Sequence, residues 1–224
     1  MKTLTIPNKK VLKERFGCLQ DGKDIYSLAY NIFFEKPKGL DFTMRDTSLL
    51  KKSGGLYHGY SRTTEKHAKK IFDSLILNGE DKLLDIGCGK GAVLKTATEY
   101  PFQEIAGIDI DANLIDIAVR NFQILGMEDR VSCMRISATE FKEYNKYNIF
   151  FMFNPFSGPV MEKVVDELLK VSEKKEITII YYNPVYLELF RQKGKVTILK
   201  QLYDKTKNYY TCIFTVKPMQ KTAS

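Results

Sequence analysis

A short glycine-rich segment is the part of this sequence whose spacing most clearly indicates ligand chemistry. In Asp85-Ile86-Gly87-Cys88-Gly89-Lys90-Gly91, three glycines alternate with other residues directly after an apolar run. Glycines at such positions let the backbone approach a ligand closely and let a strand pack tightly against the next helix. The spacing differs from the G-x-G-x-x-G of dinucleotide-binding loops, and no Gly-Lys-Ser/Thr ends it as in a P-loop. The segment predicts a strand-to-helix turn that either cradles a ligand or has only a structural role.

The second feature is the spacing between this loop and an acidic residue, Asp109. Asp109 ends a second apolar run 22 residues after Gly87, close to the roughly 20 residues that separate a glycine loop from an acid that receives ribose hydroxyls. A carboxylate that accepts two hydroxyl donors forms strong, charge-assisted hydrogen bonds. The alternative is that Asp109 only caps the next helix, but Asp111 is better placed as that cap.

Strands and helices alternate regularly from residue 81 onward. Apolar runs typical of buried strands alternate with amphipathic segments of 9 to 15 residues, which predicts βαβ units and a parallel sheet covered on both faces. The predicted strands are 82–86, 104–110, 130–136, 148–153, 177–182, 195–203 and 208–217. The predicted helices are 24–35, 63–77, 92–100, 112–125, 160–171 and 185–192. Only four residues separate the last two strands, so we expect an antiparallel hairpin there.

Two motifs resemble those of a known family. The segments Leu83-Leu84-Asp85-Ile86-Gly87-Cys88-Gly89-Lys90-Gly91 and Gly107-Ile108-Asp109-Ile110-Asp111 are similar to motifs I and II of class I S-adenosylmethionine-dependent methyltransferases. The stretch 60–217 also follows that family's order of elements. The resemblance implies an α/β fold with a Rossmann-like, doubly wound, seven-stranded sheet, mostly parallel with a terminal antiparallel hairpin, plus a helical N-terminal extension. It also implies S-adenosyl-L-methionine as cofactor and S-adenosyl-L-homocysteine as its product.

The resemblance assigns the methionine end of the cofactor to the first motif. Asp85 would hold the glycine loop and, directly or through water, the methionine ammonium. The backbone of Gly87, Cys88 and Gly89 would line the methionine and the ribose.

Other cofactor contacts implied by the resemblance lie farther along the chain. Asp109 would bind the ribose hydroxyls, and Ile110 would pack against adenine. In Ser137-Ala138-Thr139 a serine stands where many members have Asp-Ala, so Ser137 would accept from the adenine amine or leave that contact to the backbone. Tyr60 and Thr63 would close over the methionine end. Alternatively, Tyr60 is a packed tyrosine and Thr63 a helix N-cap.

The segment Asn154-Pro155-Phe156 follows the predicted strand 148–153 and resembles motif IV of the family. Members that methylate amines commonly have Asn/Asp-Pro-Pro and an aromatic residue there, whereas the second proline is missing in this sequence. An amide carbonyl that accepts an N–H, with a ring that holds the substrate plane, orients a nitrogen lone pair for attack. We therefore expect Asn154, Pro155 and Phe156 to orient the acceptor, with Asn154 also near the cofactor, and transfer to nitrogen rather than oxygen. Oxygen or carbon methylation, or a simple turn, are the alternatives.

No residue stands out as a general base. His58 is a candidate because it precedes the helix that leads into the first strand, whereas His67 lies inside that helix. Tyr57 and Tyr181-Tyr182-Asn183 either line the acceptor pocket or, for the tyrosines, belong to the core.

The positive charge is concentrated in the first part of the chain. Residues 1–80 carry 15 Lys and Arg against 9 Asp and Glu, and residues 81–224 carry 20 against 18. We divide the chain into an N-terminal extension, 1–59, as a lid or acceptor-selecting region, and a cofactor-binding methyltransferase domain, 60–224. The basic extension is compatible with an RNA acceptor. A protein lysine and a small metabolite are the alternatives, and neither the acceptor nor the oligomeric state follows from the sequence.

Composition limits the class of protein. The chain has 224 residues, 44% of them hydrophobic and 28% charged, with a net charge of +8, which excludes general disorder. Cys18, Cys88, Cys133 and Cys212 are scattered, and with two histidines they form no metal-ligand pattern, so we expect no metal, reduced thiols and a cytoplasmic location. No apolar run approaches the ~20 residues of a membrane span, and no secretory signal is expected.

Two other functions share some of these features. A nicotinamide-dependent dehydrogenase would use the same ribose-binding acid, but it requires the other glycine spacing and gives no reason for the terminal hairpin. A protein that binds the cofactor without catalysis is also compatible with the motifs.

Overall fold

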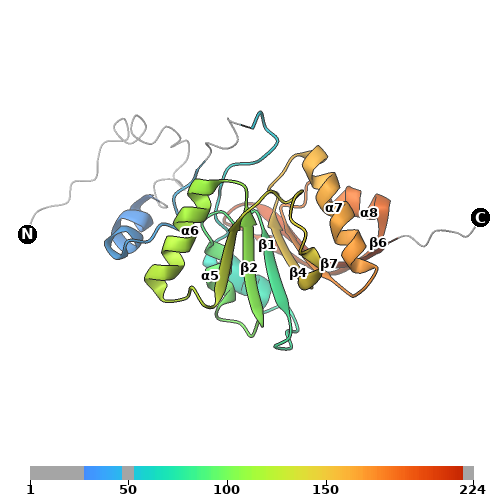
Figure 1. The fold of residues 1–224 in the computed structure, drawn as a ribbon, viewed down its shortest axis with the longest axis horizontal. Helices are drawn as coiled ribbons and strands as arrows, with labels where there is room; N and C mark the ends of the chain where they lie inside the picture. Colours follow the sequence, from blue (N-terminus) through green and yellow to red (C-terminus); the bar gives the residue numbers. More distant parts are fainter. Residues whose placement is uncertain (1–27, 47–52, 219–224) are drawn as a thin grey trace, which may run out of the picture.

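A mixed β-sheet forms the centre of the protein (Figure 1). The computed structural model describes residues 28–46 and 53–218. The strands of the sheet are β1 (Lys82–Ile86), β2 (Glu104–Asp109), β3 (Val131–Arg135), β4 (Ile149–Phe153), β5 (Thr178–Tyr182), β6 (Gly194–Asp204) and β7 (Tyr209–Pro218). Their order across this seven-stranded sheet is β3-β2-β1-β4-β5-β7-β6. Strands β1 to β5 are parallel, whereas β7 runs antiparallel to both β5 and β6. The predicted mostly parallel sheet with a terminal antiparallel hairpin is confirmed.

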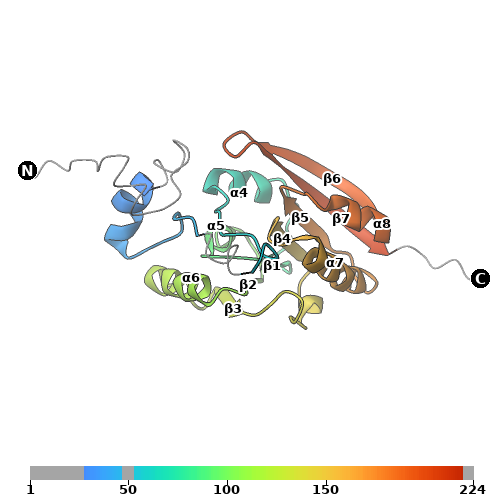
Figure 2. The same ribbon diagram turned by 90° about the horizontal axis from the view of Figure 1, so that it is seen from above.

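Helices cover both faces of the sheet. They are α4 (Glu65–Phe72), α5 (Ala92–Ala97), α6 (Ala112–Leu125), α7 (Gly158–Ser172) and α8 (Leu187–Lys193). Viewed from above, α4, α5 and α6 lie on one side of the sheet and α7 and α8 on the other (Figure 2). Each face has its own cluster of buried apolar side chains, and successive residues of β4 alternate between them, with Phe150 in one and Phe151 in the other. Strands buried on both faces are therefore apolar at nearly every position.

Strand β1 lies between β2 and β4, where the strand order changes direction. In open α/β sheets, ligands bind at such a point, outside the carboxyl ends of the strands. The chain leaves β1 through the glycine loop (residues 87–91), and the two neighbouring strands end at Asp109 and just before Asn154. The fold thus brings three predicted motifs to one edge of the sheet.

The β6–β7 hairpin reaches beyond this same edge. Tyr182 is the last residue of β5 and pairs with Thr211, so the hairpin residues 204–210 extend past the end of β5. Asn208 has a left-handed backbone conformation (φ 62°) in the turn, and its N–H donates to the Asp204 carbonyl (2.8 Å). The tip of the hairpin is consequently near the site formed by the parallel strands.

Two helices end earlier than the apolar pattern predicts. The predicted helix 63–77 spans only Glu65–Phe72, because the Ser74 hydroxyl donates to the Ile71 carbonyl (2.7 Å) and competes with helical hydrogen bonding. The predicted helix 92–100 ends at Ala97, where the Thr98 hydroxyl donates to the Lys95 carbonyl (2.7 Å) in the same way.

The N-terminal extension is described only in part. The predicted helix 24–35 falls partly outside the described residues, but 28–30 are helical and continue into a π-helical turn, η1 (Asn31–Glu35), and a 3₁₀ turn, η2 (Lys36–Lys38). None of the helices in the described ranges has the length and hydropathy of a membrane span. Within the same ranges, no group of three or more His, Cys, Asp or Glu side chains is arranged to hold a metal ion.

Candidate functional site

A cavity of about 500 Å³ opens at the edge of the sheet where the glycine loop meets the ends of β2 and β4. Its walls come from segments far apart in the sequence, including residues 57–63 and the tip of the β6–β7 hairpin. The predicted site residues that line it are Tyr60, Thr63, Asp85, Gly87, Cys88, Asp109, Ile110, Ala138, Asn154, Pro155 and Phe156. The fold therefore places the predicted cofactor and acceptor motifs around one space.

The glycine loop is shaped by close contacts on two sides. Gly87 (φ 85°) and Gly89 (φ 54°) adopt backbone conformations that favour glycine. A Cβ atom at Gly87 would lie 2.7 Å from the Cβ of Pro155, and one at Gly89 would lie 2.1 Å from the ring of Tyr60. Any larger residue would therefore displace either the acceptor motif or Tyr60.

Asp109 connects the glycine loop to the end of β2. Its carboxylate accepts hydrogen bonds from the backbone N–H of Gly89 (2.9 Å) and of Asp111 (3.0 Å). Burial raises the pKa of Asp109, and these backbone donors partly oppose the rise. Asp111 caps α6 by accepting from the N–H of Asn113 (2.9 Å), as predicted. Asp109 is therefore free of the capping role and faces the cavity.

Asp85 is a buried acid at the end of β1. Burial, and next the negative charge of Asp109, raises the pKa of Asp85 well above its usual range. No residue in the described ranges donates a hydrogen bond to its carboxylate. A positively charged ligand group in the cavity would relieve this unfavourable burial.

Tyr60 and Thr63 form the wall opposite the glycine loop. The Tyr60 hydroxyl donates to the Phe42 carbonyl (2.6 Å), and burial raises its pKa well above the usual range. The Thr63 hydroxyl is buried without a hydrogen-bond partner in the described structure. It does not cap α4, because that role belongs to Thr64, which accepts from the N–H of His67. Because buried hydroxyls normally have a hydrogen-bond partner, that of Thr63 indicates that a ligand in the cavity supplies one.

The acceptor motif is held by the segment that precedes α4. Asn154 has φ 37°, and its backbone carbonyl contacts Nδ1 of His58 at 2.6 Å. The N–H of His58 donates to the Pro155 carbonyl (2.9 Å), and the ring of Tyr57 packs edge-on against Phe156 with centroids 5.8 Å apart. The carbonyl can only accept, so the proton lies on Nδ1 and Nε2 of a neutral His58 is left as an acceptor.

Comparison with known proteins identifies the family. Residues 83–175 match the profile of the family described as a methyltransferase domain. The fold is similar to that of an RNA methyltransferase from Salinibacter ruber in complex with S-adenosyl-L-homocysteine, with a TM-score of 0.56 and 15% identity over 73% of this chain and 97% of that one. Residues 83–175 therefore resemble a methyltransferase domain, and the fold is similar to that of this RNA methyltransferase. The predicted family resemblance is thereby confirmed.

Two curated methyltransferases are similar to shorter parts of the chain. The rRNA N(6)-adenosine-methyltransferase metl-5 of Caenorhabditis elegans is 38% identical over 55 residues, which are 24% of this chain and 26% of the relative. The ribosomal RNA small subunit methyltransferase A of Malacoplasma penetrans (strain HF-2) is 26% identical over 106 residues, 47% of this chain and 37% of the relative. The chain thus spans between about a quarter and two fifths of the length of these relatives.

Two predicted cofactor residues do not line the cavity of this methyltransferase fold. The backbone of Gly89 is covered by the ring of Tyr60, and its N–H is bonded to Asp109. Ser137 is buried, and its hydroxyl lies 3.0 Å from that of Thr139 and 3.5 Å from that of Tyr57. Gly89 and Ser137 therefore contact residues of the cavity wall but do not line the cavity themselves.

Three other residues of the cavity wall carry no sequence motif that would predict them. Arg45, Lys207 and Tyr209 line the mouth of the cavity although no motif marks them. Lys207 and Tyr209 arrive there only because β7 pairs with β5, which no local pattern reveals. Of the two alternatives for Tyr181 and Tyr182, pocket or core, the structure supports the core, because both are fully buried there, whereas Asn183 lines the cavity.

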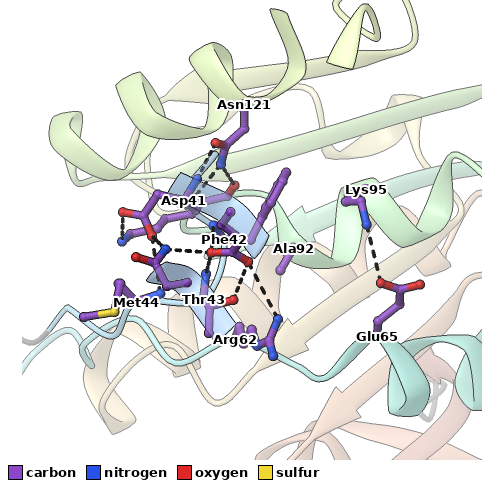
Figure 3. A network of polar contacts seen from close by, with 12 residues as sticks. Asp41, Phe42, Thr43, Met44, Arg62, Glu65, Ala92, Lys95 and Asn121 are labelled. Carbon is purple, nitrogen blue, oxygen red and sulfur yellow. Dashed lines mark hydrogen bonds and ion pairs between the residues drawn. The ribbon is translucent and has the colours of Figure 1, made fainter. Parts of the chain in front are cut away.

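The described residues 28–46 of the predicted N-terminal extension contact the rest of the chain through Asp41, which Figure 3 shows beside Asn121 of α6. Asp41 and Asn121 exchange hydrogen bonds, with the N–H of Asp41 donating to Oδ1 (2.9 Å) and Nδ2 donating to the Asp41 carbonyl (3.0 Å). The Lys90 ammonium, whose side chain is only 4% exposed, contacts the Asp41 carboxylate at 2.7 Å. Lys90 belongs to the glycine loop and Asn121 to α6, so Asp41 joins the extension to both.

A buried glutamate organises the extension itself. Glu35 accepts hydrogen bonds from the backbone N–H groups of Phe42 (3.1 Å) and Thr43 (3.0 Å), from the Thr43 hydroxyl, and from Nδ2 of Asn31 (2.8 Å). The hydrogen bonds to Glu35 therefore close the turn 36–41, which ends at Asp41.

Replacing Asp85 with Asn is expected to stabilise the ligand-free protein at pH 7. The pKa of Asp85 is higher in the folded protein than in the unfolded chain. The protonated carboxyl therefore stabilises the fold below about pH 4, and this stability is lost as the pH rises through the folded pKa. In chemical denaturation, the free energy of unfolding of D85N should exceed that of the wild type at pH 7, with the difference shrinking toward pH 4. The matched control is D116N, an exposed position on α6, which should change nothing. Equal stability of D85N and wild type at pH 7 would show that burial of the charged Asp85 carboxylate does not destabilise the protein.

Replacing Asp41 with Asn should loosen the extension. The change leaves the buried Lys90 ammonium without its counterion, and because Asp41 is itself 23% exposed, we expect a cost of about 1–3 kcal/mol, below that of a fully buried pair. Amide hydrogen exchange of residues 28–46 should accelerate in D41N. Combining D41N with K90M should recover part of the loss, and strictly additive effects would show that the two side chains do not interact.

Proposed function

We propose that this protein transfers a methyl group from S-adenosylmethionine to a nitrogen atom of a planar acceptor, and releases S-adenosylhomocysteine. One observation carries the proposal: Asp109 and the segment Asn154-Pro155-Phe156 line the same cavity. A ribose-binding acid and an acceptor-orienting motif therefore face a common space. The match of residues 83–175 to a methyltransferase domain supports the reaction class.

The residues of the cavity suit this cofactor. Asp109 is assigned to the ribose hydroxyls and Asp85 to the methionine ammonium, which would relieve the burial of its carboxylate. The unpartnered hydroxyl of Thr63 gains a polar partner. Ile110 and Ala138 belong to an apolar part of the wall that suits adenine. When bound, S-adenosylmethionine supplies a methyl group made electrophilic by its sulfonium.

The acceptor end of the cavity is arranged to hold an N–H group. The side-chain oxygen of Asn154 receives only a long contact from the Tyr181 hydroxyl (3.4 Å), so it can accept from the acceptor nitrogen. The ring of Phe156 is fixed by Tyr57 and presents a face to a planar group. Nε2 of His58 is the base that we assign to the proton lost from the nitrogen.

The aromatic walls favour a nucleobase as the acceptor. Phe153, Phe156 and Tyr209 line this end of the cavity, and flat rings hold a base by stacking. The similarity to two RNA methyltransferases agrees with this choice. A protein lysine, a small metabolite or an oxygen acceptor would each appear as a different labelled product in the tests below.

We further propose that the N-terminal extension, residues 1–59, acts as a lid or acceptor-selecting region on the domain formed by 60–224. Support comes from the contact of Asp41 with Lys90 and from the hydrogen bond between Tyr60 and Phe42, which connect the extension to two walls of the cavity. The free thiols Cys88, Cys133 and Cys212 agree with a reducing compartment, and we propose a cytoplasmic location.

Replacing Asp109 with Ala should abolish most of the cofactor affinity. Loss of two charge-assisted hydrogen bonds to the ribose predicts at least a 10-fold rise in the dissociation constant of S-adenosylhomocysteine, measured by isothermal titration calorimetry. D116A on the exposed face of α6 is the control and should bind normally. If the wild type binds NAD and neither sulfur ligand, the proposed function fails.

Replacing Asn154 with Gly should lower turnover and leave cofactor affinity within about 3-fold. Glycine tolerates the positive φ of this position, so the variant removes the amide without straining the turn. Radiolabelled methyl transfer to RNA, protein and small-molecule fractions should fall by about 100-fold in the fraction that the wild type labels. N208G, at another left-handed asparagine, is the control. Equal loss of cofactor binding would make Asn154 a structural residue, and label on oxygen would overturn transfer to nitrogen.

A further inference from the structure

A groove separate from the cavity runs between α4 and β6. It encloses about 670 Å³, and its charged lining residues are Glu65, Lys66, Lys69, Lys70, Asp73 and Lys200. Because Lys66 and Lys70 are one helical turn apart, they project from the same side of α4 toward the strand that carries Lys200.

The acids of this groove already have partners. Lys69 contacts Glu65 at 3.0 Å and Glu99 at 2.9 Å, and Asp73 accepts a hydrogen bond from the Tyr100 hydroxyl (2.7 Å). The other three lysines of the groove are exposed and form no ion pair within the described ranges. The groove therefore presents three lysines without ion pairs to a ligand, and with four lysines against the two acids Glu65 and Asp73 its lining has a net positive charge of 2.

The groove and the cavity are neighbours. Residues 61–63 line the cavity and lead directly into α4, which forms one side of the groove. The other side is β6, and the turn that follows it carries Lys207, whose ammonium contacts the Ser61 hydroxyl at 2.8 Å. In Figure 2, α4 lies beside the β6–β7 hairpin along this route. A chain that leaves the cavity across Ser61 and Lys207 would enter the groove.

We infer that this groove binds the phosphates of a single-stranded nucleic acid whose base occupies the cavity. The inference rests on the proposed function and names the acceptor as part of a polymer. A base that enters a cavity must come from an unpaired strand or be flipped out of a duplex. Lysines contact phosphates as point charges without reading sequence, and Tyr209, 38% exposed at the mouth, offers a ring for stacking.

Binding is measured by fluorescence anisotropy with a labelled 20-nucleotide single strand of mixed sequence, as RNA and as DNA, on the full chain without cofactor. The test variant is K66Q/K70Q/K200Q. The slope of log K against log[salt] is negative, and its magnitude falls by about 0.7 for each phosphate contact that is lost. In the triple variant the magnitude of the slope should therefore fall by about 2, and the affinity should fall at least 10-fold. The nucleic acid that binds more tightly identifies the source of the acceptor.

A charge-matched control separates the groove from general basicity. K142Q/K163Q/K174Q removes three exposed lysines from α7 and from segments that lead into β4 and β5, so it should keep the wild-type slope. Equal losses in both variants, no binding by the wild type, or equal displacement of the strand by polyglutamate at the same charge concentration would each overturn the inference. The last result would point to an acidic protein segment.

The two proposals fail in different ways. Calorimetry with S-adenosylhomocysteine on the same preparations tests the cofactor site, and the groove variant should bind it like the wild type because none of its substitutions lines the cavity. Normal cofactor binding without binding of the strand rejects the groove alone. Binding of the strand without any sulfur ligand rejects the proposed methyl transfer.

Discussion

The glycine loop is held to the end of β2 by backbone hydrogen bonds, and the rest of the site is arranged around that junction. The N–H groups of Gly87 and Cys88 both donate to the Ile108 carbonyl, at 2.8 and 3.0 Å. The loop is thus joined directly to the strand that ends at Asp109. Because Gly87 also lies against Pro155, the acceptor motif is seated on the same backbone. The motifs that we propose for the cofactor and for the acceptor are consequently positioned by one turn of chain rather than by separate supports.

The distribution of charge divides the molecule into two environments. Asp85 and Asp109 are buried at the cavity, where low solvent exposure raises the pKa of each carboxyl. The lysine of the glycine loop is buried too, but Asp41 compensates it. Uncompensated positive charge is found instead outside the cavity, in the groove between α4 and β6. Such an arrangement suits a cationic cofactor inside and a polyanionic partner outside, because each meets the opposite charge.

Local patterns predicted most of the sheet and left the ends of the elements uncertain. Five parallel strands were predictable because burial on both faces makes nearly every position apolar. Helix α4 is shorter than its apolar pattern because one hydroxyl, that of Ser74, bonds to the backbone. The tyrosines of β5 illustrate a different limit. Tyr182 follows a strand toward the cavity, yet its hydroxyl donates to Asp204 and its ring is buried in the core. A tyrosine at a strand end fits a pocket or a core equally well, and only its neighbours decide.

The sequence by itself determined the class of fold, the resemblance to a family and the order of the motifs, because glycine spacing, strand-end acids and apolar periodicity are local properties of the chain. The tertiary structure alone decided which distant segments share the cavity. It placed Lys207 and Tyr209 at the mouth through the antiparallel pairing of β7 with β5, and it joined Asp41 to the glycine loop across 49 residues. Such contacts depend on sheet pairing and on buried charge compensation. Both involve residues far apart in the chain, and neither leaves a periodic signal in the sequence.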